Sequence, residues 1–257
     1  MRRVVVTGAN RGLGLEFTRQ LLAAGDEVVA GARRPETADE LDKLVSTSGG
    51  RGTVVRLDVS DPAEVAAAAL HIGERFDAVD LLVNNAGVWA APGEPDRLSA
   101  GALAELRPEA VLEVLRINAV GPILVTQALA PLLAAAGRSE RLTPPLSGGH
   151  PPSPGATVVN LSSGLGSLAG ATSRGNVAYG MSKAALNMLT RHLAAELRRQ
   201  GTVVVAVSPG WVATDMGGPS AGLEPPESVH GLLNVVDALT PAQSGMFLDH
   251  TGATLPW

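Results

Sequence analysis

Cysteine is absent from the 257 residues of this sequence. Its absence excludes disulfide bonds, thiolate metal ligands and cysteine nucleophiles, and it is typical of the reducing cytoplasm, where we expect this protein to be found. The five histidines are scattered without the spacing of a metal site, so no metal is predicted. The net charge of −5 comes without a tract of lysine and arginine, which argues against nucleic-acid binding.

Long hydrophobic runs are also lacking. Only three valines follow the opening Met-Arg-Arg, which is too short for the apolar core of a signal peptide. The most apolar segment, residues 118–137, is interrupted by Asn118, Thr126, Gln127 and two prolines. We therefore expect this segment to form a buried or interface helix and not a membrane span.

Short runs of β-branched residues alternate with alanine- and leucine-rich stretches along the chain, 45% of which is hydrophobic. The runs are continuous rather than alternating in polarity, as expected for strands buried on both faces. We therefore predict an α/β fold, a Rossmann-type doubly wound parallel sheet of about seven strands flanked by helices, in a single domain over residues 1–257. Strands are expected at 3–7, 27–31, 53–57, 80–84, 156–161, 202–207 and 245–249, and helices near 11–24, 37–47, 62–75, 109–136, 177–200 and 227–238. Ligands of such sheets bind at the carboxyl ends of the strands.

Two segments are predicted to lie outside these regular elements. Residues 137–155 are rich in proline, serine, glycine and arginine and have no apolar period, so we expect an exposed insertion. The α/β pattern resumes beyond them, which argues against a linker between two domains. Residues 211–228 contain several glycines and prolines and are predicted to form a short lid over the substrate.

A glycine-rich turn, residues 7–14 (TGANRGLG), joins the first strand to the first helix. Its glycines permit a tight turn and a close approach of the backbone to a pyrophosphate, and the start of the helix supplies positive potential. The turn therefore predicts a dinucleotide site, with a plain structural turn as the alternative.

The end of the second strand bears on the choice of dinucleotide. An NAD enzyme places a carboxylate there to bind the ribose hydroxyls, but this chain has Ala32 followed by Arg33 and Arg34. Arg11 in the glycine-rich turn adds a third guanidinium, and guanidinium groups bind phosphate in a bidentate manner. The sequence therefore favours NADP(H), whose ribose carries a 2′-phosphate, over NAD(H).

Tyr179 is the only tyrosine of the chain, and Lys183 follows it by four residues in an alanine-rich helix. This spacing places both side chains on one face of the helix, about one turn apart. A phenol ordinarily titrates near 10, and a neighbouring ammonium group favours its ionised form. The pair is therefore predicted to exchange a proton with a carbonyl or alcohol group.

The glycine-rich turn has the spacing T-G-x-x-x-G-x-G, and residues 84–87 read N-N-A-G after the fourth strand. With the Tyr179–Lys183 pair, these motifs resemble those of the short-chain dehydrogenase/reductase family. The resemblance runs from residue 3 to about residue 216, and the C-terminal segment is similar to C-factor-like and sniffer-like carbonyl reductases. It implies that Asp58 contacts the adenine, with a helix cap as the alternative role for this carboxylate.

The resemblance also assigns roles near the reacting atoms. It implies that Ser163 orients the carbonyl oxygen, that Asn118 kinks its helix and completes a proton relay, and that residues 209–214 meet the nicotinamide. The interval from Ser163 to Tyr179 is longer than is usual in the family, so Ser162 remains an alternative. The predicted catalytic residues are Asn118, Ser163, Tyr179 and Lys183. The predicted cofactor-binding residues are Gly8, Asn10, Arg11, Gly12, Leu13, Gly14, Arg33, Asp58, Val59, Asn85, Ala86, Gly87, Tyr179, Lys183, Pro209, Gly210, Val212 and Thr214.

These features together predict an NADP(H)-dependent oxidoreductase that acts on a small ketone, aldehyde or secondary alcohol. The alternative is a non-enzymatic dinucleotide-binding protein for signalling or redox sensing, of the C-factor type. Apolar faces on the helices near 109–136 and 177–200 favour a homodimer or homotetramer, although packing on the sheet alone would also account for them. Trp89 and Met181 are candidate walls of the substrate pocket.

Overall fold

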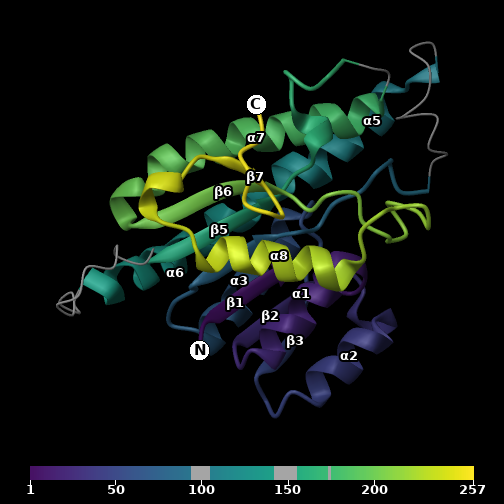
Figure 1. The fold of residues 1–257 in the computed structure, drawn as a ribbon. Coiled ribbons are helices and arrows are strands. Elements are labelled where there is room, and N and C mark those ends of the chain that lie inside the picture. Colours follow the sequence, from purple (N-terminus) through teal and green to yellow (C-terminus); the bar gives the residue numbers. More distant parts are fainter. Residues whose placement is uncertain (94–104, 142–154, 173–174) are drawn as a thin grey trace.

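A computed structural model gives the structure of residues 1–93, 105–141, 155–172 and 175–257. Seven parallel strands form one sheet in the order β3-β2-β1-β4-β5-β6-β7 (Figure 1). The strands are β1 (Arg3–Thr7), β2 (Glu27–Ala32), β3 (Gly52–Arg56), β4 (Leu81–Asn84), β5 (Ala156–Leu161), β6 (Thr202–Ser208) and β7 (Phe247–Asp249). The predicted Rossmann-type, doubly wound fold is confirmed.

Helices cover both faces of the sheet. They are α1 (Gly12–Ala23), α2 (Asp39–Ser46), α3 (Pro62–Arg75), α5 (Pro108–Leu115), α6 (Gly121–Arg141), α7 (Val177–Leu197) and α8 (Pro225–Asp237). One core contains Val4 and Val6 of β1 with residues of α1, α2 and α8, and the other contains Val5 with residues of α3, α6 and α7. Successive side chains of a strand thus enter opposite cores, which explains why the strands read as continuous apolar runs.

The helix expected near 109–136 is built differently. A π-helical turn, Arg116–Val120, separates α5 from α6, and α6 continues to Arg141. The first five residues of the predicted insertion 137–155 are therefore helical, because arginine and glutamate favour helix and a single glycine is tolerated within one. Residues 142–154 lie outside the described part of the chain.

The segment predicted to form the lid, residues 211–228, is not irregular throughout, because α8 begins at Pro225. Proline favours the first turn of a helix, where its missing N–H is not needed. Residues 211–224 therefore form the connection between β6 and α8, and we call them the β6–α8 segment.

Within the described residues, Pro108–Ala136 is the one helical stretch that is long and apolar enough to cross a membrane. Val125, Leu129 and Leu133 of this stretch are buried against the sheet. This is the packing of a core helix in a folded domain.

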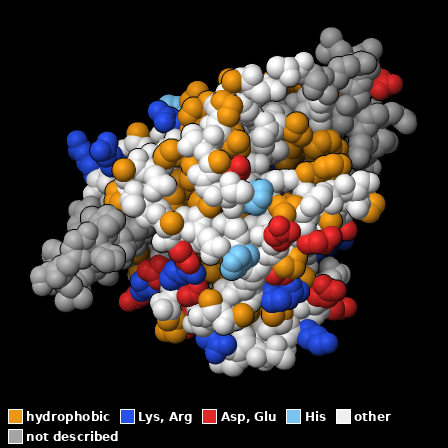
Figure 2. Space-filling view, in the orientation of Figure 1, with side chains coloured by type: hydrophobic (Ala, Val, Ile, Leu, Met, Phe, Trp, Pro, Cys, Tyr) orange, Lys and Arg blue, Asp and Glu red, His pale blue; other side chains and the backbone are white. Residues whose placement is uncertain are grey.

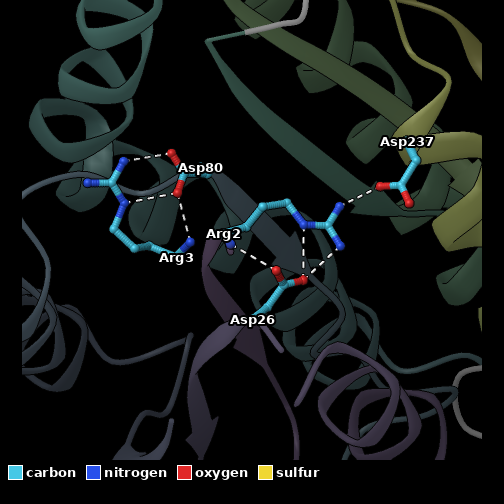
Figure 3. Close-up of polar contacts among 5 residues, drawn as sticks. All are labelled: Arg2, Arg3, Asp26, Asp80 and Asp237. Atoms are coloured by element: carbon cyan, nitrogen blue, oxygen red, sulfur yellow. Dashed lines mark hydrogen bonds and ion pairs between the residues drawn. The ribbon is translucent and has the colours of Figure 1, made fainter. Parts of the chain in front are cut away.

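Two arginines hold the start of β1 to its neighbours at the amino ends of the strands (Figure 3). Arg3 donates to Asp80, which precedes β4, from its main-chain N–H (2.7 Å) and from Nε (2.9 Å) and Nη2 (2.7 Å). Arg2 makes the same three kinds of bond to the buried Asp26, which precedes β2, and also pairs with Asp237 at the end of α8. Paired hydrogen bonds of this kind fix geometry as well as charge, so they hold the start of β1 in place at the amino ends of the strands.

Candidate functional site

The glycine-rich turn lies between β1 and α1 and leaves no room for larger residues. Gly8 has φ +64°, and a Cβ built on it would lie 2.8 Å from Cα of Ala86. A Cβ on Gly14 would lie 2.2 Å from the carbonyl oxygen of Gly8. At the start of α1, no side chain of Arg11 caps the first N–H groups. The turn is therefore a cradle of backbone with free N–H donors, which suits a phosphate.

A cavity of about 500 Å³ opens above this cradle at the carboxyl ends of the strands. Most of the predicted cofactor-binding residues line it: Gly8, Asn10, Arg11, Gly12, Leu13, Arg33, Asp58, Val59, Asn85, Ala86, Gly87, Tyr179, Lys183, Pro209 and Thr214. The remaining three do not line it. Gly14 instead packs against Gly8 and Asn85. Gly210 lies in the turn after β6, and Val212 forms a short β-bridge with Leu223.

One end of the cavity carries the arginines that the sequence singled out, with Arg34 and Thr37 beside Arg33. Asp58 also lines this end, where its Oδ1 accepts hydrogen bonds from the N–H (2.9 Å) and the hydroxyl (2.6 Å) of Ser60. Partial burial acts to raise the pKa of Asp58, but the bonds from Ser60 and nearby arginine charges outweigh it and lower the pKa below its usual value. The cap of α3 is Asp61, so the capping role considered for Asp58 was wrong.

Arg11 is engaged by a residue that sequence reasoning missed. Its Nη1 lies 2.7 Å from Oδ2 of Asp215, in the β6–α8 segment. Both side chains are exposed, and both residues line the cavity. The pair therefore bridges the mouth of the cavity, from the glycine-rich turn on one side to the β6–α8 segment on the other.

Tyr179 lies in the first turn of α7, where Asn176 caps the helix by accepting a hydrogen bond from the N–H of Tyr179 (2.9 Å). The side chain is buried, which raises the pKa of the phenol to about 12, and a hydrogen bond with the Ser163 side chain acts in the opposite direction. The ring of Trp89 packs against it, with 4.9 Å between ring centroids and a tilt of 41°. In the absence of ligand, Tyr179 is therefore a neutral phenol at neutral pH.

Lys183 lies one turn further along α7, with its Nζ 5.4 Å from the centre of the Tyr179 ring. The ammonium group donates a hydrogen bond to the main-chain oxygen of Leu161 (2.7 Å). Complete burial lowers the pKa of this lysine to about 8. Lys183 thus remains mostly charged at neutral pH while lining the cavity beside the phenol.

The two serines after β5 have different surroundings. Ser162 is buried and donates its hydroxyl proton to Oδ1 of Asn187 (2.6 Å). Ser163 is half-buried, accepts a hydrogen bond from the N–H of Leu165 (3.2 Å), and is the serine whose hydroxyl meets Tyr179. The geometry therefore distinguishes Ser163 from Ser162, although it is Ser162 that lines the cavity.

Asn118 is fully buried at the centre of the π-helical turn. Its Oδ1 accepts from the N–H of Val88 (2.8 Å), and its Nδ2 donates to the carbonyl of Val88 (2.8 Å) and to the hydroxyl of Ser182 (2.9 Å). Turns of this type recur at functional sites because they shift one side chain out of the regular helical register. Here the turn fixes Val88, which follows the N-N-A-G motif.

Two supporting residues, Asn176 and Asn187, were also missed by sequence reasoning. Asn176 precedes a helix, so a helix-cap rule would have found it. Asn187 lies in the middle of α7 and carries no such signal. Among the described residues, no three histidine, aspartate or glutamate side chains are grouped so as to hold a metal ion.

Comparisons with known proteins agree with the fold and identify the family. The family model described as short chain dehydrogenase matches residues 2–222. The chain belongs to this family of oxidoreductases. Both the family and the sniffer-like and C-factor-like subgroup predicted from the motifs are confirmed.

Three similar proteins illustrate the range of the family. The carbonyl reductase Sniffer of Drosophila melanogaster has a TM-score of 0.89 and 31% identity, with all of both chains covered. The NADPH-bound carbonyl reductase from chicken fatty liver has a TM-score of 0.87 and 37% identity over 100% of this chain and 99% of that chain. The C-signal of Myxococcus xanthus is 42% identical over 182 residues, which are 70% of this chain and 93% of that protein.

Proposed function

We propose that this protein is an NADP(H)-dependent oxidoreductase that interconverts a small ketone or aldehyde and the corresponding alcohol. The observation that carries the proposal is the grouping of Ser163, Tyr179 and Lys183 beside a cavity with a glycine-rich cradle. An ionisable phenol, a hydroxyl group and an ammonium group are what a carbonyl oxygen needs to receive a proton.

The described residues fit a phosphorylated dinucleotide. A Cβ on Gly8 would clash with Ala86 and a Cβ on Gly14 with the carbonyl oxygen of Gly8, so glycine at both positions permits the tight turn that brings backbone to a pyrophosphate. Arg33 and Arg34 line the far end, where Ala32 replaces the carboxylate that an NAD enzyme would use. The chicken carbonyl reductase is NADPH-bound, which supports NADP(H) over NAD(H) for this chain.

In the proposed carbonyl reduction, Ser163, Tyr179 and Lys183 would have different roles. Reduced nicotinamide, when bound, supplies the hydride. Ser163 donates a hydrogen bond to the carbonyl oxygen and holds it next to Tyr179, whose phenol gives up its proton to that oxygen. Lys183 stabilises the phenolate that remains, because its ammonium group lies 5.4 Å from the centre of the ring in a buried site.

Asn118 has a positioning role in this scheme. Its side-chain amide holds Val88 and Ser182, and its Oδ1 and the Nζ of Lys183 both lie within 4 Å of the place where a Cβ of Gly87 would be. We propose that the proton relay implied by the family resemblance passes through water at this turn and returns a proton to Tyr179 by way of Lys183.

We also propose that the β6–α8 segment covers the substrate and that the protein is a cytoplasmic homodimer or homotetramer. Support for assembly comes from large apolar side chains that remain exposed on α5, α6 and α7, among them Leu112, Ile123, Met181 and Met188. Light scattering during gel filtration measures the mass, and a monomer at micromolar concentration would contradict this part of the proposal.

The alternative of a non-enzymatic signalling or redox-sensing protein is not favoured, although the C-signal is a relative. Binding a dinucleotide requires the cradle but not a phenol joined to a hydroxyl group beside a buried ammonium group. The decisive experiment is a panel of aldehydes, ketones and secondary alcohols assayed with both NADPH and NADH. We expect turnover with preference for NADPH, whereas tight NADPH binding without turnover of any carbonyl compound would favour the sensor.

A further inference from the structure

The backbone around Trp89 is held at three points. Both main-chain polar groups of Val88 are bonded to Asn118, and the carbonyl oxygen of Trp89 accepts a hydrogen bond from Nδ2 of Asn176 (2.7 Å). Asn176 is also the cap of α7, so the same residue that positions Tyr179 positions Trp89. The two rings therefore keep a fixed relation, with 4.9 Å between their centroids.

Other large apolar side chains lie in the loops that leave the same edge of the sheet. Leu165, Trp211 and Met216 are 51%, 62% and 44% exposed, and they follow β5 and β6, while Trp89 follows the neighbouring β4. Figure 2 shows hydrophobic side chains gathered at the right of the molecule, where these loops leave the sheet in Figure 1. Exposed apolar side chains at the edge of the sheet that carries the cavity favour a ligand with apolar surface.

Their positions are tied to the reacting groups. The N–H of Leu165 donates to the hydroxyl of Ser163, and Met216 lines the same cavity as Tyr179. Nε1 of Trp211 donates to the carbonyl of Gly217 (2.8 Å), which fixes the second indole ring to the β6–α8 segment.

Charge is scarce in these loops. Within the described segments 88–93, 163–172 and 209–218, Asp215 is the only charged residue, and it is paired with Arg11. The described parts of these loops therefore offer no cation to a carboxylate or phosphate on the substrate.

We propose that Trp89 is a specificity-determining residue that packs on the substrate, and that the site takes uncharged carbonyl compounds with an aromatic ring next to the carbonyl group. This inference rests on the proposed function. The carbonyl group becomes an alcohol by a two-electron reduction, in which the hydride comes from the reduced cofactor and the proton from Tyr179. An aromatic substrate ring would lie against the indole ring, which gives a favourable contact beyond simple burial.

The test compares benzaldehyde with cyclohexanecarbaldehyde, which have the same number of carbon atoms. The two aldehydes differ in intrinsic reactivity, so the quantity to follow is the change in their kcat/KM ratio between variants. Trp89→Leu keeps an apolar side chain but removes the aromatic face, and we expect it to lower the benzaldehyde preference roughly two- to tenfold. Trp89→Phe should retain most of the preference, and Trp257→Leu, a matched change in a ring that stacks on Phe247, should retain all of it.

The outcomes separate this inference from the function on which it rests. An unchanged ratio in Trp89→Leu, with both aldehydes still reduced through Tyr179, overturns the role of Trp89 and leaves the oxidoreductase in place. Loss of the preference in Trp257→Leu as well also overturns it, because the effect would then not be local. If the wild-type protein reduces other carbonyl compounds but neither of these aldehydes, the proposed substrate class is wrong. If it reduces no carbonyl compound at all, the proposed function fails too.

Discussion

The side chain of Lys183 in α7 donates a hydrogen bond to the main-chain oxygen of Leu161, with 2.7 Å between Nζ and the oxygen. Leu161 is the last residue of β5 and directly precedes the two serines. One buried ammonium group therefore fixes the helix that carries Tyr179 to the end of β5, two residues before Ser163. The same bond holds the charged group in a buried position, and this burial lowers the pKa of Lys183.

The stability of the ligand-free protein should rise with pH above pH 8 because of Lys183. Its pKa is lowered from 10.5 to about 8 in the folded protein, so between these values the unfolded chain binds a proton that the folded chain does not. From pH 8 to pH 10 this difference should raise the free energy of unfolding of the wild type by about 2 kcal/mol relative to Lys183→Met. Urea denaturation at several pH values measures it.

Lys43→Met is the control for this measurement, because Lys43 is the only other lysine and is exposed. Its stability should follow that of the wild type at each pH. If Lys183→Met and the wild type had parallel pH profiles over this range, Lys183 would not be a buried ammonium group in the ligand-free protein.

Changes of the two serines should have opposite signatures. Ser163→Ala removes a half-buried hydroxyl that meets Tyr179, so we expect kcat to fall roughly a hundred- to thousandfold with little change in stability. Ser162→Ala leaves Oδ1 of the buried Asn187 without its partner, so we expect a loss of about 1–3 kcal/mol in stability and a smaller loss of kcat. Thermal unfolding and steady-state kinetics on both variants check this, and the reverse pattern would make Ser162 the catalytic hydroxyl.

The Arg11–Asp215 pair should compete with the 2′-phosphate of the cofactor for the guanidinium group. An exposed pair of this kind contributes at most about 1 kcal/mol, so Asp215→Asn should tighten NADPH binding by up to about fivefold at low salt. Arg11→Ala should weaken NADPH binding about tenfold and NADH binding much less, because only NADPH carries the extra phosphate. Calorimetric titration at 50 and 500 mM salt measures both effects, and equal losses for the two cofactors would assign Arg11 to another part of the ligand.

Much of the fold follows from patterns that are local in the chain. The strands could be located because residues such as Val4, Val5 and Val6 enter cores on both faces of the sheet, so each strand reads as one apolar run. The cradle and the Tyr179–Lys183 pair could be predicted for the same reason, since each depends on residues within one turn or one helical face. The motif spacing was sufficient to identify the family.

The features that could not be predicted join residues that are distant in sequence. Nothing near Arg11 in the chain indicates Asp215, and nothing near Tyr179 indicates that Trp89 packs on its ring. The bond from Ser162 to Asn187 is of the same kind, because it depends on how α7 packs beside β5. Helix boundaries were wrong where residues on both sides of the boundary tolerate helix, as at the end of α6.

The central claim is that Tyr179 is the proton donor of a carbonyl reductase, and Tyr179→Phe tests it most directly. Phenylalanine keeps the ring that packs against Trp89 and removes only the hydroxyl group, so the fold and the NADPH dissociation constant should remain within about twofold of the wild type. Carbonyl reduction measured by NADPH oxidation should fall roughly a hundred- to ten-thousandfold. Turnover equal to that of the wild type, with NADPH still bound, would contradict the account.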